Sequence, residues 1–600
     1  MQTYAAPLRD MRFALTELHD VAALTALPAF SDLDADAIAT ILEAAGKLAT
    51  EVLLPLNAPG DAHGCTLENG VVRTPPGFRA AYAAFRAGGW NAVTGDPAYG
   101  GQGLPQTVGM LVSEMICAAN LSFSLYPGLT AGATIAIDRF ASDALRALYL
   151  PKLTQGIWAG TMCLTEAHCG TDLGLLRTRA VPAGDGSYRL TGSKIFVSAG
   201  EHDLTENIVH MVLARLPGAP PGIKGVSLFL VPKYLPGTDS GPDGGVGARN
   251  GVTCTALEHK MGIKGSATCQ LSFDDAQGWL VGAPHKGMHG MFTMMNSERL
   301  GVGIQGLGLI EAAYQSAVRY ARDRLQGRAL PGPRRPDLPA DPIIVHPDVR
   351  RMLMTMRVHA EGCRALGVWV ANRLDAAEHA ADARARRDAE DFVALMTPVV
   401  KAMFTDFAVE SANLAMQVHG GHGYIRDHGI EQYARDARIT QIYEGTNGIQ
   451  ALDLVGRKLP AHAGRSLRGL FHPIADFIEN IRADPDMEKF AAGLERAFGT
   501  LQLATRHIAT RGLADPEEAG AAAGDYLRLT GLVALAYLWA RAARIAIARH
   551  GAAGPDQTFY AAKRISAEFF FDRILPDATA CYLKIRSGKA SMMAMPETAF

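Results

Sequence analysis

Residues 435–448 read RDARITQIYEGTNG and place one glutamate, Glu444, between an apolar stretch and a glycine-rich turn. Its neighbours Ile442 and Tyr443 are expected to desolvate the carboxylate in part, which would raise its pKa towards neutrality. Gly445 lets a ligand come close to the backbone beside it. The run therefore predicts a catalytic base, and the alternative for the same residues is a turn that simply ends a helix.

The bulk composition describes a globular protein of several domains. The 600 residues exceed one hydrophobic core, and about 150 residues per domain suggests roughly four units. Hydrophobic residues make up 48% of the chain, charged residues 20%, and the formal net charge is -2, so nothing favours nucleic acid or an anionic membrane as a partner. No window offers about 18 uncharged apolar residues, so we expect no membrane span.

The cysteines and the first residues bear on the cellular location. Eight cysteines are scattered without a Cys-x-x-Cys pair, which is typical of free thiols in a reducing compartment and argues against disulfides and zinc. The first 30 residues mix charged with apolar positions, unlike a secretory signal. We expect a cytoplasmic protein, although an organelle precursor after trimming would look the same.

Hydrophobic periodicity changes several times along the chain. After an N-terminal extension (residues 1–32), helical spacing predicts a helical domain over 33–157, and β-branched and aromatic runs predict a β-domain over 158–285. Within the β-domain, residues 235–251 are rich in glycine and proline and predict an exposed loop. Helical spacing returns over 286–460, interrupted by prolines, and an additional helical domain follows at 465–600. The expected class is a multidomain α+β protein.

Residues 162–173 read MCLTEAHCGTDL, and together with residues 435–448 they resemble the acyl-CoA dehydrogenase family. The order of helix, sheet and helix matches that family, which implies a barrel-like or sandwich β-domain followed by a four-helix bundle. Residues 465–600 resemble the extra helical domain of a longer branch of the family. The resemblance implies FAD as cofactor, an acyl-CoA thioester as substrate and an electron-transfer flavoprotein as acceptor.

The resemblance also implies a flavin site in the β-domain. Residues 162–171 would wrap the isoalloxazine edge and the pyrophosphate, although Ala167 and His168 stand where Pro and Gly are usual. In LTGSKIFVSAG, residues 190–200, Phe196 takes the place of a tryptophan that stacks on the flavin, and Ser198 that of a threonine. The implied contacts are Met162, Leu164, Thr165, Gly170, Thr171, Phe196 and Ser198.

Further residues resemble those that hold the FAD of a neighbouring subunit, namely Arg324, Gln417, Gly420 and Gly421, and Thr446 joins the cofactor set. Such a site needs at least a homodimer, and a homotetramer would also satisfy it. Pro347 and Gly448 stand where glutamines are often found, which implies different hydrogen bonds to the cofactor. The simpler alternative is that Arg324 is a solvated charge and that the glycines end a helix.

Asn296, Arg299 and Gly445 resemble contacts to the CoA thioester, and Glu298 between the first two is a rival base. A minority branch of the family carries its base at the position of Glu298. Two carboxylates in one pocket would repel, so only one can be a freely ionised base near neutral pH. We favour Glu444 because its YEGT context is intact, and we interpret Glu298 as a salt-bridging or supporting residue.

Two other motifs have simpler explanations. GVGIQG at residues 301–306 has the letters of a dinucleotide-binding fingerprint, but no strand is expected before it, so we interpret its small residues as positions where helices pack closely. His419, His422 and His428 lack the spacing and acidic partners of a metal site, so we expect no metal.

The implied reaction is α,β-dehydrogenation. Glu444 would take the α-proton while the β-hydride leaves to flavin N5, which gives a trans-2-enoyl-CoA. An acyl-CoA oxidase that uses oxygen and a non-catalytic binding relative are the alternatives. The substrate stays open between medium to long acyl chains and 3-methylthiopropanoyl-CoA.

Overall fold

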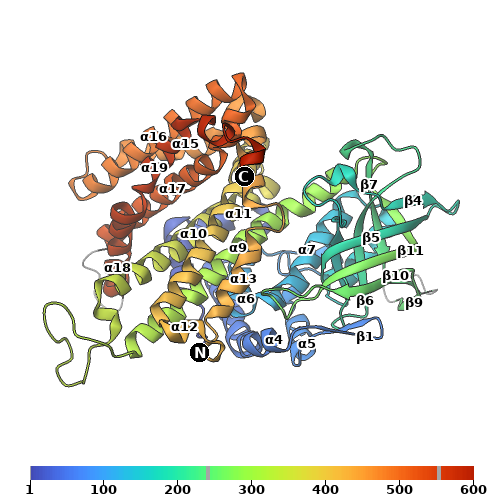
Figure 1. The fold of residues 1–600 in the computed structure, drawn as a ribbon, viewed down its shortest axis with the longest axis horizontal. Coiled ribbons are helices and arrows are strands. Elements are labelled where there is room, and N and C mark those ends of the chain that lie inside the picture. The colour runs from blue at the N-terminus through green and yellow to red at the C-terminus, as the bar shows by residue number, and fades with distance from the viewer. Residues whose placement is uncertain (1, 238–243, 550–555) are drawn as a thin grey trace. The chain divides into compact units, whose positions relative to one another are not determined.

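The computed structural model describes residues 2–237, 244–549 and 556–600 (Figure 1). The chain forms two compact units that alternate along the sequence. One comprises Lys47–Pro105 and Ala119–Gly301, and the other comprises Met1–Gly46, Gln106–Ala118 and Val302–Phe600. The first unit carries the sheet, and the second is helical.

The first unit begins with helices and one short hairpin. Its helices are α4 (Asn57–His63), α5 (Phe78–Ala87), α7 (Leu121–Phe140) and α8 (Asp143–Thr154). Asn120 caps α7, because its side chain accepts a hydrogen bond of 3.0 Å from the Phe123 N–H. The hairpin of β1 (Thr66–Glu68) and β2 (Val71–Arg73) corrects the all-helical prediction for residues 33–157. Its turn is Asn69-Gly70, with φ of 52° and 77°, a signal that the sequence contained.

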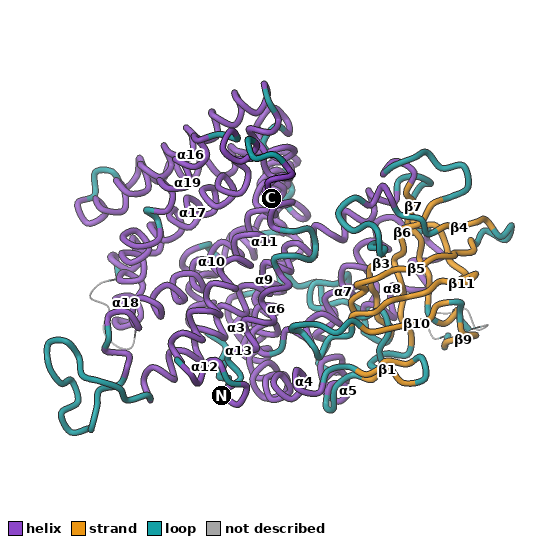
Figure 2. The backbone as a smooth tube through the Cα atoms, viewed as in Figure 1, coloured by secondary structure: helices purple, strands orange, loops and turns teal. Residues whose placement is uncertain are grey.

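A seven-stranded sheet forms the core of the first unit. Its strands are β3 (Trp158–Cys163), β4 (Arg179–Pro182), β5 (Tyr188–Ser198), β6 (Asn207–Arg215), β7 (Val226–Pro232), β10 (Val252–Leu257) and β11 (Thr268–Val281). The path runs β10-β11-β5-β4-β6-β3, and β7 pairs with both β11 and β6. Strands β11, β5, β4, β6 and β7 therefore close into a circuit, as expected for a barrel-like domain (Figure 2).

The barrel interior is apolar. Side chains such as Leu190, Val212, Phe229 and Phe273 alternate inward from four strands and are almost fully buried. The predicted exposed loop at 235–251 is partly wrong, because β8 (Tyr234–Pro236) pairs with β9 (Val246–Arg249). Residues 238–243 of that prediction lie outside the described residues.

Long helices build the second unit. They are preceded by α1 (Leu8–Arg12), α2 (Val21–Thr25) and α3 (Ala35–Lys47). The bundle consists of α6 (Gln106–Ala119), the part of α9 (Gly287–Asp323) from Val302 onwards, α10 (Pro347–His379) and α11 (Ala383–His419). A Cβ on Gly303 would lie 2.6 Å from Val400, and one on Gly306 would lie 2.8 Å from the Phe404 carbonyl. These glycines let α9 lie against α11, which confirms the packing explanation of the GVGIQG run.

The C-terminal helices are α15 (Arg468–Ile481), α16 (Glu488–Ala514), α17 (Pro516–Ala548), α18 (Asp556–Phe569), α19 (Asp577–Ser587) and α20 (Ala590–Met593). Helix α17 is their centre, with Leu529, Leu532, Val533 and Ala536 all buried. Helices α11 and α17 are long and apolar enough to cross a membrane by length and composition. The apolar windows are 78% and 72% buried inside the protein, however, as in core helices of a soluble fold.

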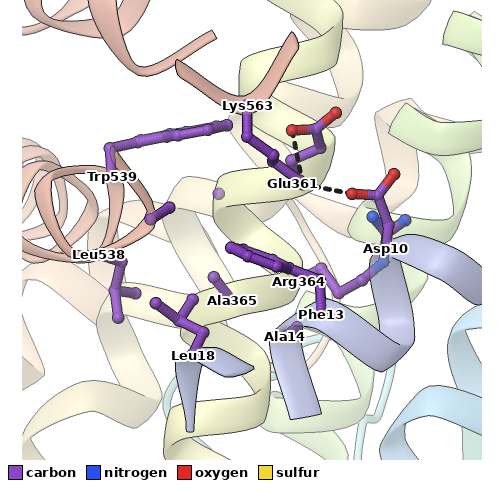
Figure 3. A pocket seen from close by; sticks show the side chains of 12 residues that line it. Asp10, Phe13, Ala14, Leu18, Glu361, Arg364, Ala365, Leu538, Trp539 and Lys563 are labelled. Carbon is purple, nitrogen blue, oxygen red and sulfur yellow. Dashed lines mark hydrogen bonds and ion pairs between the residues drawn. The ribbon is translucent and has the colours of Figure 1, made fainter. Parts of the chain in front are cut away.

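Ion pairs between largely buried side chains connect helices of the second unit. Arg364 of α10 bonds Glu114 of α6 at 2.5 Å and Glu311 of α9 at 2.6 Å. Lys563 of α18 pairs with Asp10 of α1 and, at 2.8 Å, with Glu361 of α10 (Figure 3). The cavity beside this pair has a volume of about 20 Å³, room for about one water molecule, so it is no substrate site.

Candidate active site

The loop implied to bind flavin follows β3 and turns tightly at its tip. The backbones of Glu166 and Cys169 exchange hydrogen bonds of 2.9 and 3.0 Å, which leaves Ala167 and His168 exposed at the tip. Met162 is buried in β3, Leu164 and Thr165 are half-buried, and Gly170 and Thr171 are exposed. The loop therefore offers one shielded and one open hydroxyl.

Strand β5 lies directly beside this loop. The Ile195 N–H donates to the Thr165 carbonyl at 2.9 Å, and the Thr161 hydroxyl donates to the Ser198 carbonyl at 2.5 Å. The structure thus brings residues 162–171 together with Phe196 and Ser198. The Phe196 ring is 60% exposed, and its φ of 56° is unusual for a bulky residue. Strain of this kind clusters at ligand sites, and an exposed aromatic face beside threonine hydroxyls fits a flat ring system such as a flavin.

A buried ion pair between Lys194 and Glu166 holds the loop at residues 162–171 in place. Lys194 of β5 donates to Glu166 and to the Leu164 carbonyl, both at 2.9 Å. Glu166 also accepts hydrogen bonds from the Thr178 N–H and hydroxyl and from the Arg177 N–H. Burial by itself would raise the pKa of Glu166, but the Lys194 charge and these hydrogen bonds lower it to about 2. The carboxylate is a fixed anion that holds the loop.

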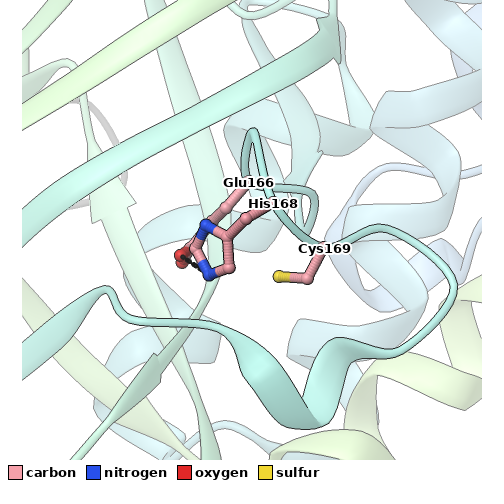
Figure 4. A group of neighbouring side chains, drawn as sticks. All are labelled: Glu166, His168 and Cys169. Atoms are coloured by element: carbon pink, nitrogen blue, oxygen red, sulfur yellow. Dashed lines mark ion pairs between the residues drawn. The ribbon is translucent and has the colours of Figure 1, made fainter.

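Glu166, His168 and Cys169 gather potential metal ligands within 4.8 Å of one another (Figure 4). Both Glu166 oxygens already accept hydrogen bonds from protein groups, and the Lys194 ammonium competes with a cation. Burial also raises the pKa of the Cys169 thiol, which disfavours the thiolate that a metal needs. The group is better explained as the turn of the loop.

Glu444 lies in the connection between α13 (Glu431–Thr440) and α14 (Asn447–Asp453) and is half-buried. Its φ is 56° and that of Gly445 is 86°, so two consecutive residues are left-handed. Only the second is a glycine, and a glutamate in this conformation is strained. The backbone here must be held in place by surrounding contacts.

The neighbours of Glu444 differ in part from expectation. Ile442 is 47% exposed, so it does not provide the desolvation predicted from the sequence. Tyr443 is half-buried, and its hydroxyl donates to Gln305 of α9. The Thr446 hydroxyl accepts from the Ile449 N–H at 3.3 Å and so caps α14, a structural role that the sequence prediction did not include.

Buried polar residues that sequence reasoning missed surround the turn. Gln450 donates from its side-chain amide to the carbonyls of Glu444 and Gly445, at 3.1 and 3.2 Å. Asn447 accepts a hydrogen bond of 2.8 Å from Lys401 of α11, a lysine with no exposed surface. Lysine is rarely fully buried, so Lys401 within an apolar helix was the feature of the sequence that could have indicated a buried polar contact here.

Two of the three residues implied to contact the thioester lie on α9, and the third, Gly445, lies in the turn beside Glu444. Arg299 is buried and donates to the Asn296 side chain at 3.3 Å, while Asn296 is exposed. Glu298 is half-buried, and a Cβ on Gly132 of α7 would lie 2.6 Å from its carboxylate oxygen. Gly132 therefore leaves room for this side chain.

The residues implied to contact a neighbouring subunit's FAD are exposed. Arg324 directly follows α9, Gln417 lies in the last turn of α11, and Gly420 ends that helix with a φ of 59°. A Cβ on Gly421 would meet no atom within 4 Å, and its φ is not positive, so neither packing nor conformation explains this glycine. Its backbone is open to an approaching ligand.

The three nearby histidines have structural contacts of their own. Tyr320 stacks on His419 with ring centroids 4.2 Å apart and hydrogen-bonds His422 at 3.0 Å. His428 stacks on His422 at 4.3 Å. Among the described residues, no group of possible metal ligands includes these rings.

Four family descriptions match successive parts of the chain. They are "Acyl-CoA dehydrogenase, N-terminal domain" at residues 40–157, the "middle domain" at 161–276, the "C-terminal domain" at 285–459 and "Acetyl-CoA dehydrogenase C-terminal like" at 470–596. The middle description includes the loop at 162–171, and the third includes Glu444.

Full-length relatives have the same organisation. The chain is 41% identical over 595 residues to the 3-methylmercaptopropionyl-CoA dehydrogenase of Ruegeria pomeroyi, covering 98% of this chain and 99% of that protein. It is 34% identical to the broad-specificity linear acyl-CoA dehydrogenase of Mycobacterium tuberculosis, with 100% of both covered. A solved acyl-CoA dehydrogenase of Bacillus anthracis complexed with FAD has the same fold, with a TM-score of 0.75 and 19% identity over 96% of this chain and 91% of that one.

The fold and the matched segments define an oxidoreductase. More particularly, the chain belongs to the acyl-CoA dehydrogenase family and has the additional C-terminal domain. Its reaction is acyl-CoA dehydrogenation, and its cofactor is FAD.

Proposed function

We propose that Glu444 is the base that removes the α-proton of the acyl-CoA thioester, and that the β-hydride passes to bound FAD. The observation that carries this proposal is the strained, tightly held turn at Glu444, because stored backbone strain is typical of functional residues. Its half-buried position keeps the carboxylate partly shielded from water. The product would be a trans-2-enoyl-CoA.

FAD, when bound, supplies the electron-poor ring that accepts a hydride and a ribityl hydroxyl that stabilises the enolate oxygen. The residues on this chain that would hold the ring are Phe196, by stacking, and Thr165 and Thr171, by hydrogen bonds. Lys194 and Glu166 would keep their loop in place. Arg299 and Asn296 would hold the thioester portion of the substrate.

The decisive experiment compares Glu444→Gln with Glu298→Gln. We expect the first to lose turnover of acyl-CoA by about four orders of magnitude with FAD still bound, because the missing base leaves the α-proton in place. The second should keep most of the activity. Full activity in Glu444→Gln together with loss in Glu298→Gln would transfer the role of base to Glu298.

We further propose that an electron-transfer flavoprotein accepts the electrons. The purified protein should reduce an artificial dye or an electron-transfer flavoprotein anaerobically with acyl-CoA, and release little hydrogen peroxide in air. Rapid peroxide release without an added acceptor would instead identify an oxidase.

The exposed residues Arg324, Gln417, Gly420 and Gly421 are proposed to contact FAD held mainly by a neighbouring subunit. The active form is then at least a homodimer, which sedimentation analysis would test. Arg324→Ala should lower the bound FAD per chain without unfolding the protein.

The substrates named for the relatives define the panel of acyl-CoAs to be screened. It contains 3-methylthiopropanoyl-CoA and linear acyl-CoAs of short to long chain, each assayed with a dye acceptor.

A further inference from the structure

We propose that Gln450 and Asp406 are positioning residues that hold the Glu444 side chain in its reactive direction. This proposal rests on the proposed function, in which Glu444 is the base. Both residues act on the turn that carries Glu444, and neither is proposed to touch substrate.

Gln450 lies on the first turns of α14 and folds back over the turn. Its side chain is fully buried, and its amide N–H groups donate to the carbonyls of Glu444 and Gly445. The amide cannot be reversed, because its oxygen would then face two carbonyl oxygens. The left-handed backbone turns the carbonyls of Glu444 and Gly445 towards Gln450. The Gln450 amide supplies the hydrogen-bond donors for both.

The remaining oxygen of this amide is buried and has no hydrogen-bond partner among the described residues. Leaving a buried acceptor unpaired is costly, and proteins retain such a group where it has a purpose. The two hydrogen bonds that the Gln450 amide donates offset the cost of its unpaired oxygen and explain why a glutamine occupies this position.

Asp406 of α11 fixes the two ends of the turn. One of its carboxylate oxygens accepts hydrogen bonds of 2.7 Å from both Gln441 and Asn447. These residues lie on opposite sides of Glu444 in sequence, and the Asn447 N–H also donates to the Gln441 carbonyl at 3.1 Å. This oxygen and the backbone hydrogen bond together join the ends of the loop in which Glu444 is held. Lys401, Ala402 and Thr405 of α11 also hydrogen-bond the Asn447 side chain.

The two contacts complement each other. Asp406 holds the ends of the loop, and Gln450 holds the carbonyls of its strained centre. A glutamate at positive φ would relax to a right-handed conformation if these contacts were lost, and its Cβ would then point in another direction. A displacement of about 1 Å at a reacting group is enough to slow a reaction about 100-fold.

The principal variant is Gln450→Met, which keeps the length of the side chain and removes both donors. We expect kcat per bound FAD to fall about 10- to 100-fold, with the KM for acyl-CoA changed less than about threefold. The isotope effect on kcat with α-deuterated substrate should rise, because proton removal becomes slower than product release. A merely structural role would lower the yield of folded protein without changing the isotope effect or kcat per FAD.

Asp406 gives a second, independent pair of variants. Asp406→Asn keeps an oxygen that can accept both hydrogen bonds, so its kcat and isotope effect should stay within about twofold of wild type. Asp406→Leu removes the acceptor and should resemble Gln450→Met. Gln557→Met, at an exposed position on α18, is the control for loss of a glutamine amide and should behave as wild type.

The outcomes separate the two proposals. If Glu444→Gln is inactive while Gln450→Met and Asp406→Leu keep the wild-type kcat and isotope effect, the positioning role is wrong and the base stands. If Glu444→Gln itself is active, the base assignment fails first. If Gln450→Met does not fold, the contrast between Asp406→Asn and Asp406→Leu decides.

Discussion

Lys194 and Glu166 form an ion pair with an N–O distance of 2.9 Å, and their side chains are 0% and 5% exposed. Neither residue was assigned a role from the sequence, although both lie within the segments that resemble the family. A lysine so deeply buried is compatible with stability only when its charge is paired and hydrogen-bonded, as it is here.

Lys194→Met should therefore destabilise the first unit by about 3–5 kcal/mol, since the buried Glu166 carboxylate loses the ammonium at 2.9 Å and keeps only the more distant His168 ring at 3.7 Å as an ion-pair partner among the described residues. The free energy of unfolding in urea measures this. We also expect weaker FAD binding, measured by titrating the apoprotein and following flavin fluorescence. Lys224→Met, at an exposed position of the same unit, is the control and should change the free energy by less than about 0.5 kcal/mol.

The same ion pair predicts a pH dependence. The folded-state pKa of Glu166, about 2, lies below its ordinary value of 4.5, so its contribution to stability is complete above pH 4.5 and is lost as the pH falls towards 2. Glu166→Gln should reduce the acid sensitivity of unfolding in that range. An identical acid-unfolding midpoint in wild type and variant would contradict the role of this carboxylate.

Glu444 offers a test of backbone strain that does not depend on activity. Both Glu444→Ala and Glu444→Gly lose the carboxylate, but only glycine adopts positive φ without a steric cost. We expect the glycine variant to be more stable than the alanine variant by about 1 kcal/mol, measured by urea unfolding. An alanine variant that is equally stable would show that the turn does not hold this residue left-handed in solution.

Lys563 is the only cation on Asp10 among the described ion pairs, and it also bonds Glu361. Lys563→Met should cost about 3 kcal/mol of unfolding free energy, because Asp10, whose side chain is 22% exposed, then has no cation, while Glu361 keeps Arg357 at 2.7 Å. Lys489→Met is the matched control within the C-terminal helices. Its pair with Asp572 is about half exposed, so its loss should cost less than about 1 kcal/mol. Equal losses would exclude a special role for the buried pair.

The buried Glu114 should make the free energy of unfolding depend on pH between about 4.5 and 7. Burial raises the pKa of Glu114 to about 7, and Arg364 opposes this only in part because it is shared with Glu311. The folded protein then keeps a proton that the unfolded chain loses above about pH 4.5, so stability should fall as the pH rises from 4.5 to 7, by about 3 kcal/mol at most. Glu114→Gln should flatten this slope, whereas Glu495→Gln, at an exposed ion pair, should leave it unchanged.

Much of the fold could be predicted from the sequence. The runs at Ile208, Val226 and Gln270 form strands because β-branched and aromatic residues suit a pleated, buried surface, and they lie in β6, β7 and β11. Helix α17 forms where the helical spacing of Leu529 and Leu532 predicts it, but residues 529–540 are buried on every side, whereas the spacing predicted one buried face. The hairpin at Asn69 was missed because its strands have only three residues each, too few for a periodic signal.

The candidate site was less predictable, for a physical reason. The letters around Glu444 indicate a turn, but they do not show that Glu444 itself is left-handed, since glutamate rarely adopts that conformation. The contacts of Gln450 depend on that backbone, and those of Asp406 join residues 35 and 41 positions apart. The exposure of Ile442 likewise depends on which side of the turn faces solvent.

The position of α6 in the sequence determines when its contacts can form during translation. Residues 106–119 emerge from the ribosome early, yet the helices against which they pack, α9 and α10, begin only at residues 287 and 347. The carboxylate of Glu114 must likewise wait for Arg364 to be translated. A nascent chain therefore carries an apolar helix without its packing partners until α9 and α10 have been translated, and ribosome-associated chaperones would meet that helix before any active site exists.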